Sequence, residues 1–467
     1  MVVENGSFVN SSVLPSFGYD PGRELALDRT RKKHDLEPKE RMRDLDDPVG
    51  RSDNYISRDA DWVTFEVVVS TSPDQIALAP GYLQREWEEG GRRYFHYAMD
   101  APILNFFSFL SARYEVVRDS WNDVAIEVYH HPGHEFNLDR MIDGVKKSLD
   151  YFTVEFSPYQ HRQLRILEFP RYSSFAQSFP NTIPYSESIG FIARVEEDDI
   201  DYPFYVTAHE VAHQWWAHQV IGGNLQGSTV LSETLAQYSA LMVMEREFGA
   251  DQIRRFLRYE LDTYLRGRST ERKKEVPLLR VENQGYIHYR KGSLIMYAIR
   301  DAIGADSVNR ALAGFLETWK FQGPPYPTSR DLLGALLAET PDDLQTWVTE
   351  LFEHIILYDN RATEAVARAT GDGTYEVTLS FEAHKMRAGE QGEETEAALD
   401  DPIDIGVFDD DGEPLYLERH RLDGSTSEIT VTVEAEPARA GIDPYHKLID
   451  RHPDDNEINV EIEAGAS

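Results

Sequence analysis

The sequence predicts an α+β protein of several domains, with β-structure at both ends of the chain and helices between them. Apolar residues alternate with polar ones in 62–69 and 124–128, which is the period of a half-buried strand. From Leu138 the apolar residues recur at steps of three and four, the period of an amphipathic helix. Alternation returns beyond Arg361. With 467 residues, 41% of them hydrophobic, the chain is long enough for about two to four domains.

Composition excludes several classes of function. The chain has 47 Lys and Arg against 82 Asp and Glu, a formal charge of -35, so we expect no nucleic-acid partner and no binding to an anionic membrane surface. There is no cysteine, so any metal must be held by His, Asp or Glu. The strong acidity, with only 11 Lys beside 36 Arg, is typical of proteins adapted to high salt, and we take this halophilic composition as a hypothesis about habitat.

The predicted elements follow one another in order along the chain. Residues 20–53 are crowded with charge and predict a long surface loop, after which the two alternating stretches predict strands. Helical patterns in the middle of the chain run through 138–152, 295–303, 308–319 and 332–356. Alternation in 375–381 and 429–433 predicts a small β-sandwich in the last hundred or so residues. No stretch has the length and hydropathy of a membrane span and the first residues are not those of a signal peptide, so we expect a soluble chain.

A zinc-binding pattern lies in the middle of the chain. Asp201 can cap a helix that ends at Gly222, so His209-Glu-Val-Ala-His213 is expected well inside a helix. Residues four apart lie on one helix face, so both imidazoles can reach a single metal ion while Glu210 projects toward a metal-bound water. The ordinary alternative is a pair of helix histidines with no ligand.

A third ligand is expected because a catalytic zinc usually takes three protein ligands and keeps one position for water. Glu233 is the natural candidate, since it lies near the start of a second helical pattern, residues 229–248, beyond a glycine-rich loop. Asp199 and Asp201 are weaker alternatives, and Glu233 could also be a solvated helix carboxylate.

The two segments together resemble a known family. His209-Glu-Val-Ala-His-Gln-Trp-Trp216, followed by Leu231-Ser-Glu233-Thr-Leu-Ala-Gln-Tyr238, is similar to the zinc site of the aminopeptidase N family of gluzincin metallopeptidases. One detail departs from that family: 19 residues separate His213 and Glu233, one more than its usual gap. We place the extra residue in the loop of residues 221–227, where an insertion is easily absorbed.

The resemblance implies two further site residues. The family uses a tyrosine in a Tyr-x-Lys-Gly context, which matches Tyr289-Arg-Lys-Gly292, so Tyr289 is the expected oxyanion stabiliser and Tyr286 its nearest rival. The family also holds the substrate's free amine with a Glu upstream of the zinc helix. Here that stretch reads Pro184-Tyr-Ser-Glu187-Ser-Ile-Gly-Phe191, and only Glu187 matches, so Glu187 is either the amine anchor or a structural carboxylate.

The resemblance also implies a domain arrangement. It places a partial β-saddle domain in residues 1–120, a thermolysin-like zinc catalytic domain in 121–327, a helical connection in 328–361 and a C-terminal β-sandwich in 362–467. The zinc segment together with Ala440-Gly-Ile-Asp-Pro-Tyr-His446 looks like the peptidase-like region at the end of bacterial transporter-permease polypeptides. That likeness implies fusion to, or association with, a membrane permease and an extracytoplasmic location.

The expected function is zinc-dependent hydrolysis of peptides by an aminopeptidase that uses one Zn2+ ion. His209, His213 and Glu233 would hold the metal, Glu210 would act as general base, and Tyr289 would stabilise the oxyanion. Two alternatives remain. A thermolysin-type endopeptidase would use the same zinc and base without an amine anchor. A non-hydrolytic binding or regulatory module of a transporter would need neither Glu210 nor Tyr289.

Overall fold

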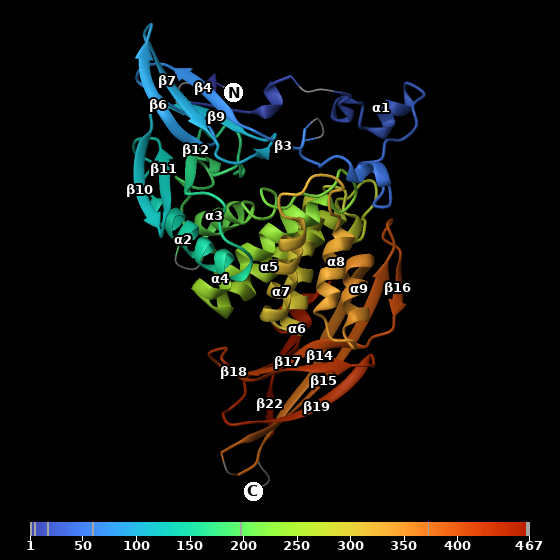
Figure 1. Cartoon of the computed structure of the whole chain (residues 1–467). Coiled ribbons are helices and arrows are strands. Elements are labelled where there is room, and N and C mark those ends of the chain that lie inside the picture. Colours follow the sequence, from blue (N-terminus) through green and yellow to red (C-terminus); the bar gives the residue numbers. More distant parts are fainter. Residues whose placement is uncertain are drawn as a thin grey trace. The chain divides into compact units, whose positions relative to one another are not determined.

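The computed structural model describes residues 2–3, 6–15, 18–57, 60–196, 199–371 and 373–463 (Figure 1). Two compact units make up the chain. Unit 1 comprises Met1–Gln252, Arg280–Asn283 and Asn309–Ala338, and unit 2 comprises Ile253–Leu279, Gln284–Val308 and Glu339–Ser467. Both units combine sheets with helices, which confirms the α+β multidomain fold class.

Small antiparallel sheets form the first part of unit 1. They are a sheet of order β1-β2-β9-β5, a pair β3-β8 and a sheet of order β4-β7-β6. The strands are β1 (Val2–Val3), β2 (Gly6–Asn10), β3 (Trp62–Val63), β4 (Glu66–Thr71), β5 (Ile76–Leu78), β6 (Tyr82–Glu89), β7 (Arg92–Ala98), β8 (Ile103–Leu104) and β9 (Ser108–Ala112). The single strand predicted for 62–69 is thus two strands, because the chain leaves β8 after Val63 and pairs with β7 from Glu66.

A mixed sheet of order β10-β11-β12-β13 follows, and it positions the residues of interest. Its strands are β10 (Glu115–Trp121), β11 (Val124–His130), β12 (Gln163–Phe169) and β13 (Thr182–Ser186). β10 runs antiparallel to β11, whereas β11, β12 and β13 are parallel to one another. The carboxyl ends of these three strands therefore lie at one edge of the sheet.

Helices cover this sheet. The predicted helix is α2 (Leu138–Glu155), whose apolar face is buried against α3 (Tyr202–Ala212) and α4 (Leu235–Phe248) and contacts β10 and β11 (Figure 1). Met141, Val145, Leu149 and Phe152 are inaccessible to solvent, as the three- and four-residue spacing predicts. The last helix of unit 1 is α8 (Ser329–Ala338).

The charged segment 20–53 has no long element. It holds only the short helices η2 (Pro21–Arg23), α1 (Asp28–Lys32) and η3 (Pro48–Arg51), which follow η1 (Ser11–Val13). Its end is nevertheless attached to the loop after α3, because Asn54 bridges Gly223 and the backbone N–H of Asn224 donates to the Gly50 carbonyl at 2.8 Å.

Unit 2 contains helices and the C-terminal β-structure. The helices are α5 (Ala250–Ser269), which begins in unit 1, η5 (Leu278–Arg280), which ends there, the π-helical turn η6 (Tyr286–Lys291), α6 (Gly292–Ile303), α7 (Ala305–Trp319), which continues into unit 1, α9 (Gln345–Glu353) and η7 (Pro453–Asp455). The helical pattern of 332–356 is interrupted after Ala338, and its last residues already belong to a strand, because Ile355 pairs with Ala388 and Ile356 pairs with Arg387.

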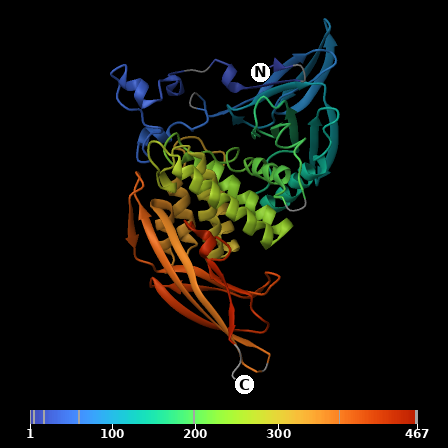
Figure 2. The same ribbon diagram turned by 180° about the vertical axis from the view of Figure 1, so that it is seen from behind.

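Two sheets form the C-terminal part of unit 2. One has the order β16-β15-β14-β22 with β19 also paired to β15, and the other has the order β18-β17-β20-β21. Their strands are β14 (Ile355–Ala369), β15 (Tyr375–Ala388), β16 (Glu394–Ala397), β17 (Asp401–Phe408), β18 (Pro414–Leu422), β19 (Thr426–Val433), β20 (Arg439–Ile442), β21 (Glu457–Asn459) and β22 (Glu461–Glu463). The long strands β14 and β15 run side by side in both views and contact β20, so the sheets pack together as a sandwich (Figures 1 and 2).

Among the residues that the structure describes, no helix combines the length and the hydropathy needed to cross a bilayer.

Candidate active site

The helix that carries His209 and His213 starts as the sequence predicts. Asp201 caps α3 by accepting a hydrogen bond from the backbone N–H of Phe204 at 3.1 Å, and Pro203 lies in the first turn. Asp201 also forms an ion pair with Arg140 on α2. This carboxylate, an alternative metal ligand in the sequence, is therefore engaged at the start of the helix.

The end of α3 differs from the prediction. The helix ends at Ala212 with His213 as its C-cap, rather than continuing to Gly222. The next residues leave the helix because Trp215 and Trp216 are completely buried, and the Gln214 side chain donates to the Phe179 carbonyl at 2.9 Å. His213 keeps helical dihedral angles (φ -62°, ψ -17°), so it still lies one turn beyond His209.

The glycines after α3 do not end the helix. They allow other backbone segments to approach the chain closely. A Cβ atom at Gly223 would lie 3.0 Å from the Gly50 carbonyl oxygen, and one at Gly222 would lie 3.2 Å from the Ser228 backbone. This loop, residues 221–227, is the one to which we assigned the extra residue.

Glu233 lies on the π-helical turn η4 (Val230–Thr234), which leads directly into α4. Turns of this type are frequent at functional sites. The preceding residue is fixed by a hydrogen bond of 2.5 Å between the Ser232 and Tyr55 hydroxyl groups. The carboxylate itself points at the two histidines.

The three expected ligands converge. His213 Nε2 lies 3.1 Å from His209 Nε2 and 3.3 Å from Glu233 Oε2, and His209 Nε2 lies 3.6 Å from the same Glu233 oxygen. Zinc bonds of about 2.0–2.1 Å in a tetrahedral site require ligand atoms about 3.3–3.4 Å apart. The donor set therefore fits a zinc ion in both chemistry and spacing.

The hydrogen bond made by the other ring nitrogen of His213 is also typical of a metal ligand. Its Nδ1 is 3.0 Å from the Trp216 carbonyl, so the Nδ1–H donates there and Nε2 keeps its lone pair toward the other two side chains. The buried turn after α3, which shortens the helix, supplies this carbonyl.

Electrostatic coupling within the triad is strong. Burial alone would lower the pKa of His213, but the neighbouring Glu233 and Glu210 carboxylates and the Trp216 carbonyl raise it to about 9. Burial tends to raise the pKa of Glu233, yet His213 and His209 hold it well below its ordinary value. The carboxylate is thus ionised and surrounded by imidazoles.

Glu210 adjoins the triad but is not one of its three convergent side chains. Burial raises the pKa of Glu210 to about 7, with a further rise from Glu233, while His213 and the Ser178 backbone N–H oppose the change. One of its oxygens, Oε2, is buried without a hydrogen-bond partner among the described residues. A carboxylate with a pKa near neutrality can both accept and return a proton.

Glu187 lies just after β13 and is almost completely buried. Its Oε1 is 3.7 Å from Arg171 Nε, and its Oε2 is 3.9 Å from His131 Nδ1. The glycine that follows is required here, because a Cβ at Gly190 would lie 2.4 Å from Met141 Cε and 2.5 Å from the Tyr185 ring.

Three residues that no sequence motif predicted surround Glu187. His131, His134 and Glu168 join it in a second cluster, in which one ligand atom from each side chain lies within 4.8 Å of the others. The only sequence signal is the spacing of three between the two histidines. The two glutamates reach the cluster through the parallel pairing of β11, β12 and β13, which no local pattern predicts.

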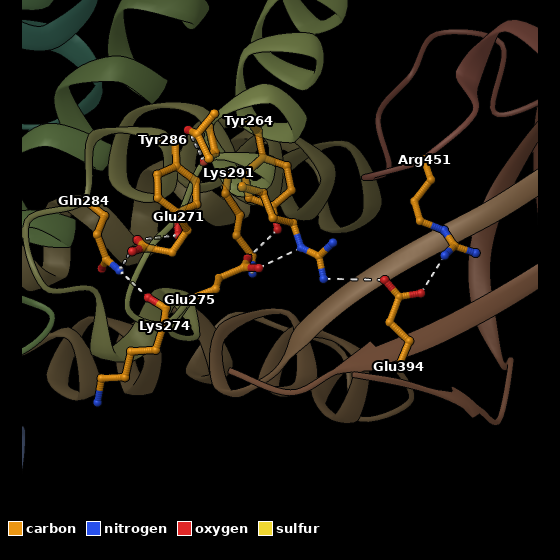
Figure 3. Close-up of polar contacts among 12 residues, drawn as sticks. Tyr264, Glu271, Lys274, Glu275, Gln284, Tyr286, Lys291, Glu394 and Arg451 are labelled. Carbon is orange, nitrogen blue, oxygen red and sulfur yellow. Dashed lines mark hydrogen bonds and ion pairs between the residues drawn. The ribbon is translucent and has the colours of Figure 1, made fainter. Parts of the chain in front are cut away.

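Tyr289 belongs to unit 2, on the π-helical turn η6. Polar contacts fix this turn within its unit: Tyr286 donates to Glu271 at 3.1 Å, and the fully buried Lys291 ammonium lies 3.4 Å from Glu275 (Figure 3). Tyr286, the rival of Tyr289, is thus bound to Glu271. The predicted role of Tyr289 stays a prediction.

Glu275 is the centre of this network. It accepts from the Tyr264 hydroxyl at 2.5 Å and from Arg268 Nε at 2.7 Å, and Arg268 continues to Glu394, which pairs with Arg451 (Figure 3). Burial lowers the pKa of Lys291, while Glu275 opposes that shift. The ion pair anchors the end of η6 at its junction with α6.

Two comparisons with known proteins found a match. Residues 139–352 match the model of the peptidase family M1 domain. The fold is similar to the crystal structure of Legionella pneumophila aminopeptidase A in complex with aspartic acid, with a TM-score of 0.59 and 16% sequence identity over 87% of this chain and 45% of that one. The chain therefore spans less than half the length of that protein. A search of curated proteins found no match. Residues 139–352, which include the whole histidine–glutamate triad, are therefore similar to the domain of peptidase family M1, the family of aminopeptidase N.

Proposed function

We propose that the chain is a zinc-dependent peptidase that releases N-terminal residues from peptides. His209, His213 and Glu233 would hold one zinc ion. The observation that carries the proposal is the convergence of His209 Nε2, His213 Nε2 and Glu233 Oε2 at 3.1–3.6 Å beside the buried Glu210. Holding a metal does not require a second carboxylate such as Glu210 beside the triad, whereas hydrolysis requires a general base there.

Each protein group has a distinct task in this proposal. When bound, zinc lowers the pKa of a water molecule and polarises the scissile carbonyl. Glu210 accepts the proton of the attacking water and then delivers it to the leaving amine as the C–N bond breaks. The Tyr289 hydroxyl donates a hydrogen bond to the carbonyl oxygen as that oxygen gains charge.

Glu187 would select substrates with a free N-terminus by pairing with their ammonium group. Its burial next to Arg171 and His131 also supports the alternative, a thermolysin-type endopeptidase, because a carboxylate that already faces two basic groups attracts an amine less strongly. A non-hydrolytic binding module attached to a transporter is the third candidate.

The substrate, the partner, the location and the domain boundaries are also proposals. The substrate would be a peptide. Fusion to, or association with, a membrane permease and an extracytoplasmic location rest on the sequence likeness alone, as do the domain boundaries at residues 120, 327 and 361.

Mass spectrometry of a mixed peptide library tests these candidates. The zinc-loaded chain is incubated with the library at high salt, and Glu210→Gln serves as the matched control. Stepwise loss of N-terminal residues that the variant does not produce supports the aminopeptidase. Internal cuts identify an endopeptidase, and an unchanged library favours the binding module.

A further inference from the structure

We propose that His131, His134, Glu168 and Glu187 form a second metal site, which binds a divalent ion of the zinc class. Nothing in the proposed peptidase mechanism uses His131, His134 or Glu168, and the inference does not rest on that function. The four side chains offer two imidazole nitrogens and two carboxylate oxygens within 4.8 Å of one another. This is the ligand chemistry of zinc and its neighbours among the divalent transition metals.

The fold brings the four groups together at one edge of a sheet. His131 follows β11, Glu168 is near the end of β12, and Glu187 follows β13. Tyr129 pairs with Leu167, and Phe169 pairs with Ser186, so the three positions are nearly level across the parallel strands. His134 comes from the loop that continues from His131.

The distances place Glu168 at the centre of the cluster. Its Oε1 lies 2.5 Å from His134 Nδ1 and 3.3 Å from His131 Nδ1, and Glu187 Oε2 lies 3.9 Å from the same His131 nitrogen. A metal among these atoms would replace the hydrogen bond between His134 and Glu168 with two coordinate bonds. The required movement is small, because ligand atoms that lie within 4.8 Å of one another would close to a tetrahedral spacing of about 3.3–3.4 Å.

The charge of the cluster calls for a cation. Glu168 is completely buried, and among the described residues its side chain forms ion pairs only with the two histidines. Glu187 adds a second, nearly buried carboxylate, whose arginine neighbour Arg171 is 71% exposed. Burying two carboxylates side by side is costly, and one divalent ion between them would offset their negative charge.

The imidazole ring of His131 is buried and held in place like that of a metal ligand. Its side chain is 8% exposed, and both ring nitrogens are buried without a hydrogen bond among the described residues. The ring stacks on Tyr114 with centroids 5.7 Å apart and planes 1° apart. A buried imidazole whose Nδ1 faces two carboxylates is the arrangement that a metal satisfies.

The surrounding contacts fix Glu168 as well. Its Oε2 accepts the His131 backbone N–H at 2.5 Å, so this oxygen is occupied and Oε1 faces the cluster. The Tyr114 hydroxyl donates to the Glu168 carbonyl at 2.8 Å, so one tyrosine supports both the ring of His131 and the backbone of Glu168. Such outer contacts hold a ligand in the orientation that a metal requires.

Metal content measured on the full chain tests the proposal. The chain is stripped with a chelator, reloaded with Zn2+, freed of excess ion and measured by inductively coupled plasma mass spectrometry. We expect two zinc ions per chain for the wild type and one for His131→Ala/His134→Ala. His384→Ala is the matched control, because it removes an exposed histidine that pairs with Glu396, and it should keep two ions.

A second measurement isolates the new site from the proposed catalytic one. In His209→Ala/His213→Ala the second cluster is intact, so Co2+ should still give a visible d–d absorption band, and adding His131→Ala should remove it. A wild type that binds a single ion, unchanged by His131→Ala/His134→Ala, overturns the second site. A wild type whose single ion disappears with those two histidines instead contradicts the proposed catalytic site and leaves the second one standing.

Discussion

The two histidine–glutamate clusters of unit 1 use the same kinds of side chain but are built in different ways. The first cluster takes its two histidines, four positions apart, from the last turn of α3 and its C-cap, and its glutamate from the next helical element. The second takes its side chains from the ends of three parallel strands and the loop after the first of them. A metal site on one helix is therefore visible in a sequence, whereas one on a sheet edge becomes visible only in the fold.

The clusters also differ in what remains after the metal ligands are assigned. Beside the first cluster lies Glu210, a carboxylate with an unpartnered oxygen and a pKa raised by burial to about 7. In the second cluster both carboxylates already face histidines, and none is left over. The first arrangement suits catalysis, and the second suits metal binding without catalysis.

The largest expected effect comes from removing a ligand of the first cluster. His213→Ala should lose peptide hydrolysis to below detection and one of two zinc ions, because two protein ligands hold zinc poorly. Metal content and turnover are measured on the same sample, with His384→Ala as control. Full activity in His213→Ala would show that the triad is not the catalytic centre.

Tyr289→Phe should have the next largest effect. Loss of one donor to the developing oxyanion lowers kcat by about 10²–10³-fold, whereas KM should change little because the hydrogen bond strengthens only in the transition state. Steady-state kinetics on a short peptide measure both constants. Tyr286→Phe is the comparison, since Tyr286 is bound to Glu271, and an equal loss of kcat in both variants would argue against a specific role for Tyr289.

Glu187→Gln tests two predicted roles of Glu187, as the amine anchor of the peptidase and as a ligand of the second cluster. If Glu187 is the amine anchor, the substitution should raise KM by about tenfold for peptides with a free N-terminus, and much less for N-acetylated peptides. If Glu187 is a ligand of the second cluster, the substitution should weaken the binding of the second zinc ion. Kinetics and metal titration separate the two roles. Unchanged KM values and unchanged zinc affinity would exclude Glu187 from both roles.

A further prediction concerns the pH dependence of stability at His161, a buried histidine whose pKa is shifted by burial alone. Burial lowers the pKa of His161 to about 3, whereas the carboxylates around His213 raise its pKa to about 9. A neutral His161 contributes stability that is complete above its unfolded pKa of about 6.5 and is lost as pH falls toward 3. Relative to His161→Gln, the wild type should lose about 1.4 kcal/mol of unfolding free energy per pH unit between about pH 6 and 4. Urea unfolding at several pH values measures this difference, and parallel pH profiles would contradict it.

Local patterns predicted much of the first site but not all of its surroundings. The spacing of His209 and His213 and the cap at Asp201 depend on neighbours in the chain, so the sequence contains them. The end of α3 was predicted wrongly because Gln214, Trp215 and Trp216 contact residues far away in the chain. Glu168 lies near the histidines because β12 pairs with β11. Such strand pairing depends on the whole sheet, so local sequence patterns do not predict it.

Turnover and zinc content of Glu210→Gln, measured on one preparation, test whether the triad and Glu210 form a hydrolytic zinc site. The substitution keeps the size of the side chain but removes the base, so we expect a loss of hydrolysis of about 10³–10⁴-fold and the zinc content of the wild type. Full turnover by Glu210→Gln with zinc retained would contradict the proposed hydrolytic mechanism.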